Sequence, residues 1–176
     1  MRILKIIFLV SIITLIACGN DMENFKPVHL KRTHEIELNG KVENIFKLFT
    51  AEGEKFWAEG WDPEFYYPEN ETTVEGAVFV TSSHENKQTV WTCVVFDESS
   101  WHVKYVRIIP GNNTAIINVK CSSSGENKTK AEVTYEFTSL SEEGNVFVKS
   151  FTDEHYEKFI DSWEVEINNY LKTKQN

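Results

Sequence analysis

The chain has 176 residues, of which 41% are hydrophobic and 13% aromatic, and its 18 basic and 27 acidic residues give a formal net charge of −9. This length supports one ordinary domain with a sizeable core rather than two, and the apolar content excludes a chain that is disordered throughout. An acidic surface without a run of Lys or Arg repels phosphate groups, which excludes nucleic-acid binding and direct electrostatic adhesion to anionic lipid.

The first 20 residues have the features of an export signal. Arg2 and Lys5 form a short basic start, and an apolar run of 12 residues, 6–17, contains both Ser11 and Thr14. Such a run is too short to cross a bilayer, which takes about 20 residues, and suits the apolar region of a signal peptide. Its end, Leu15-Ile16-Ala17-Cys18, resembles the bacterial lipobox. The resemblance implies cleavage before Cys18 and lipidation of Cys18; an ordinary secretory signal with a chance Cys is the alternative.

On the lipobox interpretation, residues 1–17 are a lipoprotein signal peptide, residues 18–27 a polar tether and residues 28–176 the folded domain. Two or more acyl chains such as palmitate anchor a protein stably, because each buried methylene contributes about 0.8 kcal/mol. We therefore expect a lipoprotein of the bacterial cell envelope, anchored to a membrane through Cys18 and facing outside the cytoplasm. Loss of Arg2 and Lys5 leaves 16 basic and 27 acidic residues, a net charge near −11.

The start of the domain predicts one strand followed by two short helices. Alternating residues of 29–38 share one face of a strand: Leu30, Arg32, His34, Ile36 and Leu38. Apolar residues at helical spacing in 42–49 and again in 51–58 predict two short amphipathic helices. The segment Gly60-Trp61-Asp62-Pro63 ends the second helix, and residues 65–67 are interpreted as a short strand.

The second half predicts a meander and one long helix. Strands are expected at 74–82, 87–96, 101–109, 113–122 and 129–139, and the short turns between them imply antiparallel neighbours. A helix is expected from 153 to 172, with Thr152 or Asp153 as its N-cap. Its apolar stripe comprises Phe159, Trp163, Ile167 and Tyr170. This stripe indicates packing against the sheet, which is compatible with a cavity beneath the helix.

The two cysteines after Cys18 carry no metal-site pattern. Cys93 and Cys121 lie on apolar strands and are interpreted as buried thiols; a disulfide between them is the alternative in an oxidising compartment. The sequence contains neither a CxxC motif nor a Cys/His cluster, so we expect no zinc site and no cofactor.

The predicted order defines an α+β fold: an antiparallel seven-stranded sheet wrapped around a long C-terminal helix, with two short helices after the first strand. This order resembles the helix-grip fold of the START/Bet v 1-like (SRPBCC) superfamily. The motifs that resemble its polyketide cyclase/dehydrase-like branch are Phe46-Lys47-Leu48-Phe49-Thr50, Gly53-Glu54 with Trp57, Gly60-Trp61-Asp62-Pro63, Thr89-Val90-Trp91-Thr92, Tyr105-Val106-Arg107 with Pro110-Gly111, and Val133-Thr134-Tyr135. The resemblance covers about residues 29–171 and implies a hydrophobic cavity between sheet and helix.

Large aromatic residues are the candidates for the walls of this cavity, since ligand pockets are mostly apolar with a few placed polar groups. They are Trp57, Trp61, Trp91, Tyr105, Phe159 and Trp163. Core packing without a ligand is the alternative for this set.

Three polar residues are candidates for ligand contacts. Arg107 shares a strand face with apolar residues, and its planar guanidinium suits a ligand carboxylate or carbonyl; an ion pair with Glu54 or Asp62, or exposure at the sheet edge, is the alternative. His34 also lies on an apolar face, where a histidine bonded to the backbone is the alternative. Glu54 could act as a general base if burial raised its pKa, and a solvated position is the alternative.

Three functions follow from these residues. The first is a membrane-anchored module that binds a hydrophobic small molecule or lipid without catalysis. The second is a cyclase- or hydratase-like enzyme that uses Arg107, His34 or Glu54. The third is a protein-interaction module, which is implied by resemblance to the helix-grip domain of a heat-shock ATPase activator. A large exposed apolar patch would favour this third function, and the sequence names no protein partner.

Overall fold

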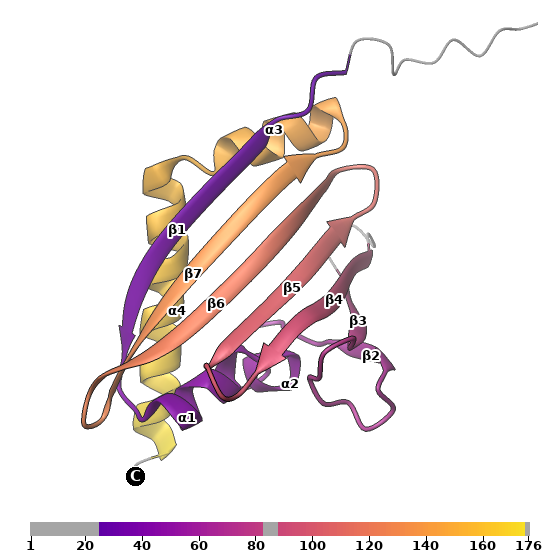
Figure 1. Ribbon diagram of the computed structural model, residues 1–176. Coiled ribbons are helices and arrows are strands. Elements are labelled where there is room, and N and C mark those ends of the chain that lie inside the picture. Colours follow the sequence, from indigo (N-terminus) through magenta and orange to yellow (C-terminus); the bar gives the residue numbers. More distant parts are fainter. Residues whose placement is uncertain (1–24, 83–87, 175–176) are drawn as a thin grey trace, which may run out of the picture.

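A computed structural model describes residues 25–82 and 88–174 of the chain (Figure 1). The predicted signal peptide of residues 1–17 and the predicted lipidation site Cys18 lie outside the described residues. Within the described part, no helix is both long and apolar enough to cross a membrane.

One antiparallel sheet of seven strands forms the body of the fold. The strands are β1 (His29–Leu38), β2 (Glu64–Tyr67), β3 (Val78–Ser82), β4 (Gln88–Asp97), β5 (His102–Ile109), β6 (Asn113–Gly125) and β7 (Lys128–Ser139). Their spatial order is β1-β7-β6-β5-β4-β3-β2, so the meander runs from β2 to β7 and the first strand pairs with the last. This arrangement confirms the predicted sheet.

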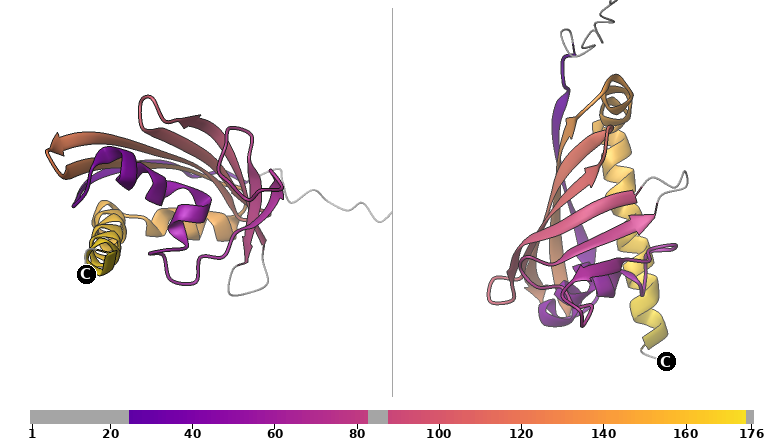
Figure 2. Two further views of the ribbon diagram at one scale, coloured as in Figure 1. Left: turned by 90° about the horizontal axis from the view of Figure 1, so that it is seen from below. Right: turned by 90° about the vertical axis from the view of Figure 1, so that its right-hand side faces the viewer.

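Five helical segments lie on one side of this sheet or at its ends. They are α1 (Val42–Ile45), the 3₁₀ segment η2 (Phe46–Phe49), α2 (Ala51–Glu54), α3 (Glu142–Ser150) and α4 (Asp153–Lys174). The long α4 crosses the concave face of the sheet, and the short segments α1 to α2 lie beside it (Figures 1 and 2). Thr152 caps α4 as predicted, because its Oγ1 accepts a hydrogen bond from the His155 N–H at 3.2 Å.

Side chains of α4 fasten the helix to β1. Arg32 Nε lies 2.7 Å from Asp153 Oδ1, and His34 Nε2 lies 2.7 Å from Asp161 Oδ1. One turn further along, the Glu37 N–H donates to Glu164 at 2.9 Å. These contacts hold α4 along the β1 edge of the sheet. They leave the concave face of β4, β5 and β6 without contacts of this kind from α4.

The packing under α4 is uneven. Its fully buried residues are Tyr156, Ile160 and Ile167, whereas Phe159 and Trp163 of the predicted stripe are only half-buried. In the sheet, Ala131, Val133, Tyr135 and Phe137 all face the core, as their alternation predicts. The core is therefore closed at the β1 and β7 side and looser where Phe159 and Trp163 face the sheet.

Several element boundaries differ from the prediction. Helix α3 was not predicted, although Ser141 caps it by accepting from the Gly144 N–H at 3.0 Å. Strand β3 begins at Val78 rather than residue 74, because a turn closed by the Ala77 N–H and the Val74 carbonyl precedes it. The two short helices are also briefer than expected, since the first becomes 3₁₀ at Phe46 and the second ends at Glu54.

The chain is docked before β1 begins. The Asn145 side-chain amide donates to the Lys26 carbonyl at 3.1 Å, and the Val28 N–H donates to Ser139 Oγ at 2.7 Å. Residues 26 and 27, which were predicted to belong to the tether, therefore lie against α3 and the end of β7.

Cys93 and Cys121 are free and buried, on β4 and β6. Their interpretation as buried thiols is therefore confirmed, and the alternative disulfide is not formed. Burial raises the pKa of each thiol to about 12, which keeps both in the unreactive protonated form at neutral pH.

Candidate functional site

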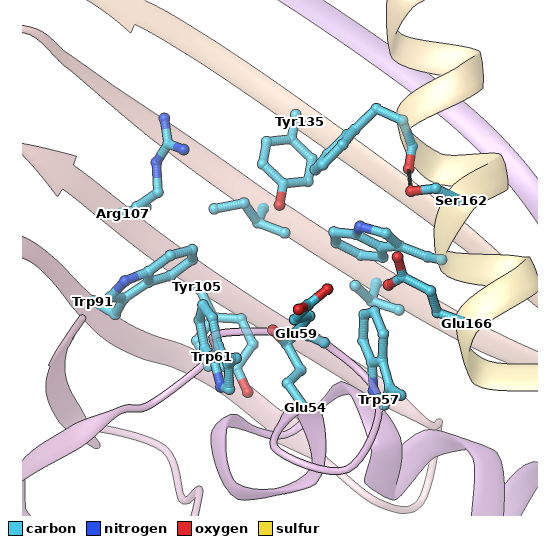
Figure 3. Close-up of a pocket in the computed structure, with 15 residues that line it drawn as sticks. Glu54, Trp57, Glu59, Trp61, Trp91, Tyr105, Arg107, Tyr135, Ser162 and Glu166 are labelled. Atoms are coloured by element: carbon cyan, nitrogen blue, oxygen red, sulfur yellow. Dashed lines mark hydrogen bonds between the residues drawn. The ribbon is translucent and has the colours of Figure 1, made fainter. Parts of the chain in front are cut away.

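A cavity of about 350 Å³ lies between α4, the sheet and the segment from Glu54 to Trp61 (Figure 3). The sheet contributes Trp91, Tyr105, Arg107, Ile117, Val119 and Tyr135; α4 contributes Phe159, Ser162, Trp163 and Glu166; and the segment after α2 contributes Trp57, Ala58, Glu59 and Trp61, with Glu54 at the end of α2 itself. The space is the one that the uneven packing of α4 leaves open.

The register of the sheet determines which side chains lie next to one another on the floor of the cavity. Tyr105 pairs with Ile117, which pairs with Tyr135, so these three side chains form one row across β5, β6 and β7. In the next row, Arg107 lies between Trp91 and Ala115. Because Ala115 has a small side chain, the Arg107 side chain can extend over β6 toward Phe137 on β7, which pairs with Ala115.

The aromatic walls are held by hydrogen bonds to the protein. The Trp57 and Trp61 indoles donate to the carbonyls of Leu48 and Ala51, each at 2.7 Å. On the sheet, the Trp91 indole donates to Thr81 Oγ1 at 3.0 Å. With their polar atoms paired, these rings are fixed in place and present apolar surface to the cavity.

Glu54 is positioned by a tight approach of the backbone at Gly53. A Cβ added to Gly53 would lie 1.9 Å from the Lys47 carbonyl oxygen, so only glycine allows α2 to pack on the preceding 3₁₀ turn. The Thr50 hydroxyl caps α2 by accepting from the Gly53 N–H at 3.0 Å. Glu54 ends this helix at the cavity wall.

The Glu54 carboxyl is half-buried in this apolar lining, and burial raises its pKa from 4.5 to about 8. No opposite charge or hydrogen bond from residues 25–82 or 88–174 offsets the loss of hydration. Burial therefore favours the protonated form of Glu54, whose carboxyl can donate a hydrogen bond as well as accept one.

Arg107 is a half-buried cation that the described residues pair only in part. Its Nη2 donates to Asn113 Oδ1 at 2.6 Å, and its guanidinium lies 5.6 Å and 5.9 Å from the ring centres of Phe137 and Phe147. Its Nε is buried without a hydrogen-bond partner. Burial lowers the Arg107 pKa, although an arginine remains charged at neutral pH.

The contacts of Arg107 do not offset the cost of burying its charge. Removing a charged group from water costs several kcal/mol even after the protein relaxes. Cation–π contacts return about 0.5–2 kcal/mol and one hydrogen bond to a neutral amide about 1 kcal/mol. The ion pair with Glu54 or Asp62 that the sequence left open is not formed; Asp62 is exposed, with its Oδ1 4.0 Å from Lys55 Nζ.

Eight of the nine residues predicted for the ligand site line this cavity: Trp57, Trp61, Trp91, Tyr105, Arg107, Glu54, Phe159 and Trp163. The exception is His34, which does not line this cavity. His34 faces the helix side of the sheet as its alternation predicts, but β1 is the edge strand beside α4, where the ring contacts Asp161 instead.

Sequence reasoning missed four polar members of the lining: Glu59, Tyr135, Ser162 and Glu166. Tyr135 had been assigned to the core face of β7, but its hydroxyl points into the cavity (Figure 3). Tyr135 lies in the same row across the sheet as Tyr105 and Ile117. A prediction of the strand register would therefore have placed its side chain beside theirs in the cavity. Glu59 and Glu166 are exposed at the rim and carry no sequence signal. Across the described ranges 25–82 and 88–174, no cluster of His, Cys, Asp and Glu is placed to hold a metal ion.

No protein-family model and no curated protein sequence matches the chain. Solved structures do match it. Norcoclaurine synthase from Thalictrum flavum, in complex with dopamine and hydroxybenzaldehyde, has a TM-score of 0.62 and 11% identity, and the match covers 98% of each chain. Mll3558 protein from Rhizobium loti has a TM-score of 0.58 and 14% identity over 81% of this chain and 99% of that one. An uncharacterised protein from Rhizobium leguminosarum has a TM-score of 0.57 and 10% identity over 84% and 97%.

At these identities the likeness establishes the fold alone. The chain has the helix-grip fold of Bet v 1-like, or SRPBCC-type, proteins, with a seven-stranded antiparallel sheet, short helices after the first strand and a long C-terminal helix. The resemblance to the superfamily fold is thereby confirmed, whereas the polyketide cyclase/dehydrase-like branch stays a prediction.

Proposed function

We propose that the domain binds one compact, predominantly apolar molecule in the cavity under α4 without transforming it. The observation that carries the proposal is the cavity itself, which the core leaves unfilled although seven aromatic side chains surround it. A pocket with mostly aromatic walls and a few placed polar groups is the usual form of a small-molecule site, which supports an apolar occupant here.

The volume of the cavity limits the size of the apolar molecule that it can hold. Its volume of about 350 Å³ is at the lower end of the roughly 300–1,000 Å³ typical of small-molecule sites. This space suits an aromatic or isoprenoid metabolite better than a diacyl lipid. One similar structure, norcoclaurine synthase, is a complex with dopamine and hydroxybenzaldehyde, both compact aromatic molecules. That likeness supports the ligand class by analogy of fold only.

A neutral fluorescent probe, N-phenyl-1-naphthylamine, tests the proposal. We expect saturable binding to the wild-type domain and at least tenfold weaker binding to Ile117→Phe, because Ile117 is buried on the cavity floor. Ile116→Phe is the matched control, since the neighbouring Ile116 is 40% exposed on the opposite face of the sheet. Absence of binding, or equal binding by both variants, would contradict the proposal.

We further propose that Cys18 anchors the domain to a membrane of the bacterial envelope. The support is the lipobox-like end of the apolar run and the position of the docked N-terminal segment, which leaves the fold beside α3. Cys18→Ala should move the protein from the membrane fraction to the soluble fraction, and labelled palmitate should be incorporated into wild type only. Failure of wild type to incorporate palmitate would contradict the anchor.

An enzyme is the second candidate, and one observation favours it: a cavity carboxyl, Glu54, whose pKa lies near neutral pH. Its would-be partner Arg107 lies on another side of the cavity (Figure 3). His34 is not part of the lining and contacts Asp161 instead. If the domain is a catalyst, turnover of any substrate should be lost in Glu54→Gln while binding is retained.

The third candidate, a protein-interaction module, has weaker support. The exposed large hydrophobic residues of the described part are distributed over many elements: Phe56, Tyr66, Tyr67, Val94, Ile108, Ile116, Leu140, Val146 and Val165. Single exposed hydrophobic residues are normal on a protein surface, so this distribution does not favour a docking site.

A further inference from the structure

We propose that Arg107 forms an oxyanion subsite in the cavity, and that the ligand is therefore a compact aromatic or alicyclic compound carrying a carboxylate. This inference rests on the proposed ligand-binding function and names the chemical class of the ligand. The carboxylate would lie beside the guanidinium of Arg107 and the hydroxyl of Tyr135, and the apolar body would lie among the tryptophan rings.

The first argument is the missing counter-ion of Arg107. None of the ion pairs formed among the described residues includes Arg107, and within that part of the chain its guanidinium donates a hydrogen bond only to the neutral side chain of Asn113. The contrast with Arg32 is direct: Arg32 also faces the helix side of the sheet, and there α4 supplies Asp153 at 2.7 Å. The fold thus provides an acid for one of these two arginines and leaves the other facing a cavity.

The second argument is the placement of a second donor. The Tyr135 hydroxyl points into the cavity, and the Arg107 charge acts on its pKa. This hydroxyl makes no hydrogen bond with any described residue, whereas the Tyr105 hydroxyl donates to the Phe49 carbonyl at 3.1 Å. The Tyr135 pKa is raised well above its ordinary value, chiefly by burial, so the hydroxyl keeps its proton. The Arg107 guanidinium has no acidic partner among the described residues, and the Tyr135 hydroxyl has no acceptor among them. Both groups can therefore donate to the oxygens of a carboxylate.

The third argument is the distribution of the carboxyl groups. Glu54, Glu59 and Glu166 lie on the α2 and α4 sides of the cavity, away from Arg107 on β5 (Figure 3). Glu59 and Glu166 are exposed at the rim, where water hydrates them, and neither neutralises Arg107. This arrangement repels an anionic group from the rim and attracts it to the Arg107 end, which orients an amphipathic ligand.

An isosteric pair of probes tests the subsite: 2-naphthoate, which carries a carboxylate, and 2-naphthamide, which has the same shape without the charge. Calorimetric titration of the wild-type domain should show at least about tenfold tighter binding of the naphthoate, as expected for charge-assisted hydrogen bonds. Arg107→Gln should reduce the preference to about twofold or less, with little change in naphthamide affinity. Arg107→Lys keeps the charge and should retain part of the preference.

Arg32→Gln is the matched control, because it removes the same charge from the same side of the sheet without touching the cavity lining. It should leave the preference for naphthoate unchanged. Equal affinity of wild type for the two probes would overturn the oxyanion subsite while leaving the proposed ligand binding intact, and so would a preference that survives in folded Arg107→Gln. If wild type binds neither probe, nor N-phenyl-1-naphthylamine, the proposed function itself fails.

Discussion

Replacing Glu54 by glutamine should stabilise the domain at neutral and alkaline pH and leave its stability unchanged in acid. The Glu54 carboxyl keeps its proton in the folded state until the pH approaches its raised pKa of about 8, whereas in the unfolded chain it ionises near pH 4.5. Between these two values the folded state binds one more proton than the unfolded state, so the free energy of unfolding falls as the pH rises.

The size of the effect follows from the two pKa values. A change from 4.5 to about 8 corresponds to about 5 kcal/mol if the carboxyl were wholly shielded from water. Because Glu54 is half-buried beside an open cavity, solvent screening reduces this figure, and we expect about 2–3 kcal/mol. The penalty is absent below pH 4.5, grows between pH 4.5 and 8, and is constant above pH 8.

Urea unfolding of wild type and Glu54→Gln at pH 4.0, 6.0 and 8.5 measures this difference. The two curves should coincide at pH 4.0 and separate by about 2–3 kcal/mol at pH 8.5, with glutamine the more stable. Glu166→Gln is the control, because that carboxyl lines the same cavity but is exposed, and its curve should stay within about 0.5 kcal/mol of wild type. A Glu54→Gln variant that is less stable than wild type at every pH would refute the burial argument.

Two further substitutions test how the elements around the cavity are held. Gly53→Ala should lower the free energy of unfolding by about 2 kcal/mol or more, since its Cβ would overlap the Lys47 carbonyl oxygen; a loss below about 0.5 kcal/mol in urea titration would contradict the tight approach. Thr152→Ala should cost about 1 kcal/mol by removing the cap of α4, measured in the same way, and an unchanged midpoint would show that the cap contributes nothing.

The sequence predicted the sheet and the long helix because both carry strong periodic patterns. The alternation of Val133, Tyr135 and Phe137 in β7 identified the core face, and the spacing of Phe159, Trp163 and Ile167 identified the face of α4. Helix α3 was missed because Gly144, Val146 and Val148 are poor helix formers. Its signal was Ser141 followed by two acidic residues, a typical helix start.

The aromatic part of the site was predictable, whereas its electrostatics was not. The tryptophans line the cavity because large apolar side chains that face the helix side of the sheet are buried between the sheet and α4. The pairing of charges depends on which element covers which strand: α4 covers β1, so it supplies Asp161 to His34 and Asp153 to Arg32. It does not reach the charged end of Arg107, and no pattern along the chain reveals that an acid is missing there.

The central claim is that the space under α4 holds one compact apolar molecule. Native mass spectrometry of the domain purified from the cells that produce it, with fragmentation of any bound species, tests this claim directly. We predict a single adduct smaller than a diacyl lipid, present on wild type and on Ile116→Phe and absent from Ile117→Phe. A wild-type domain that carries no adduct, or an adduct retained equally by Ile117→Phe, would contradict the account.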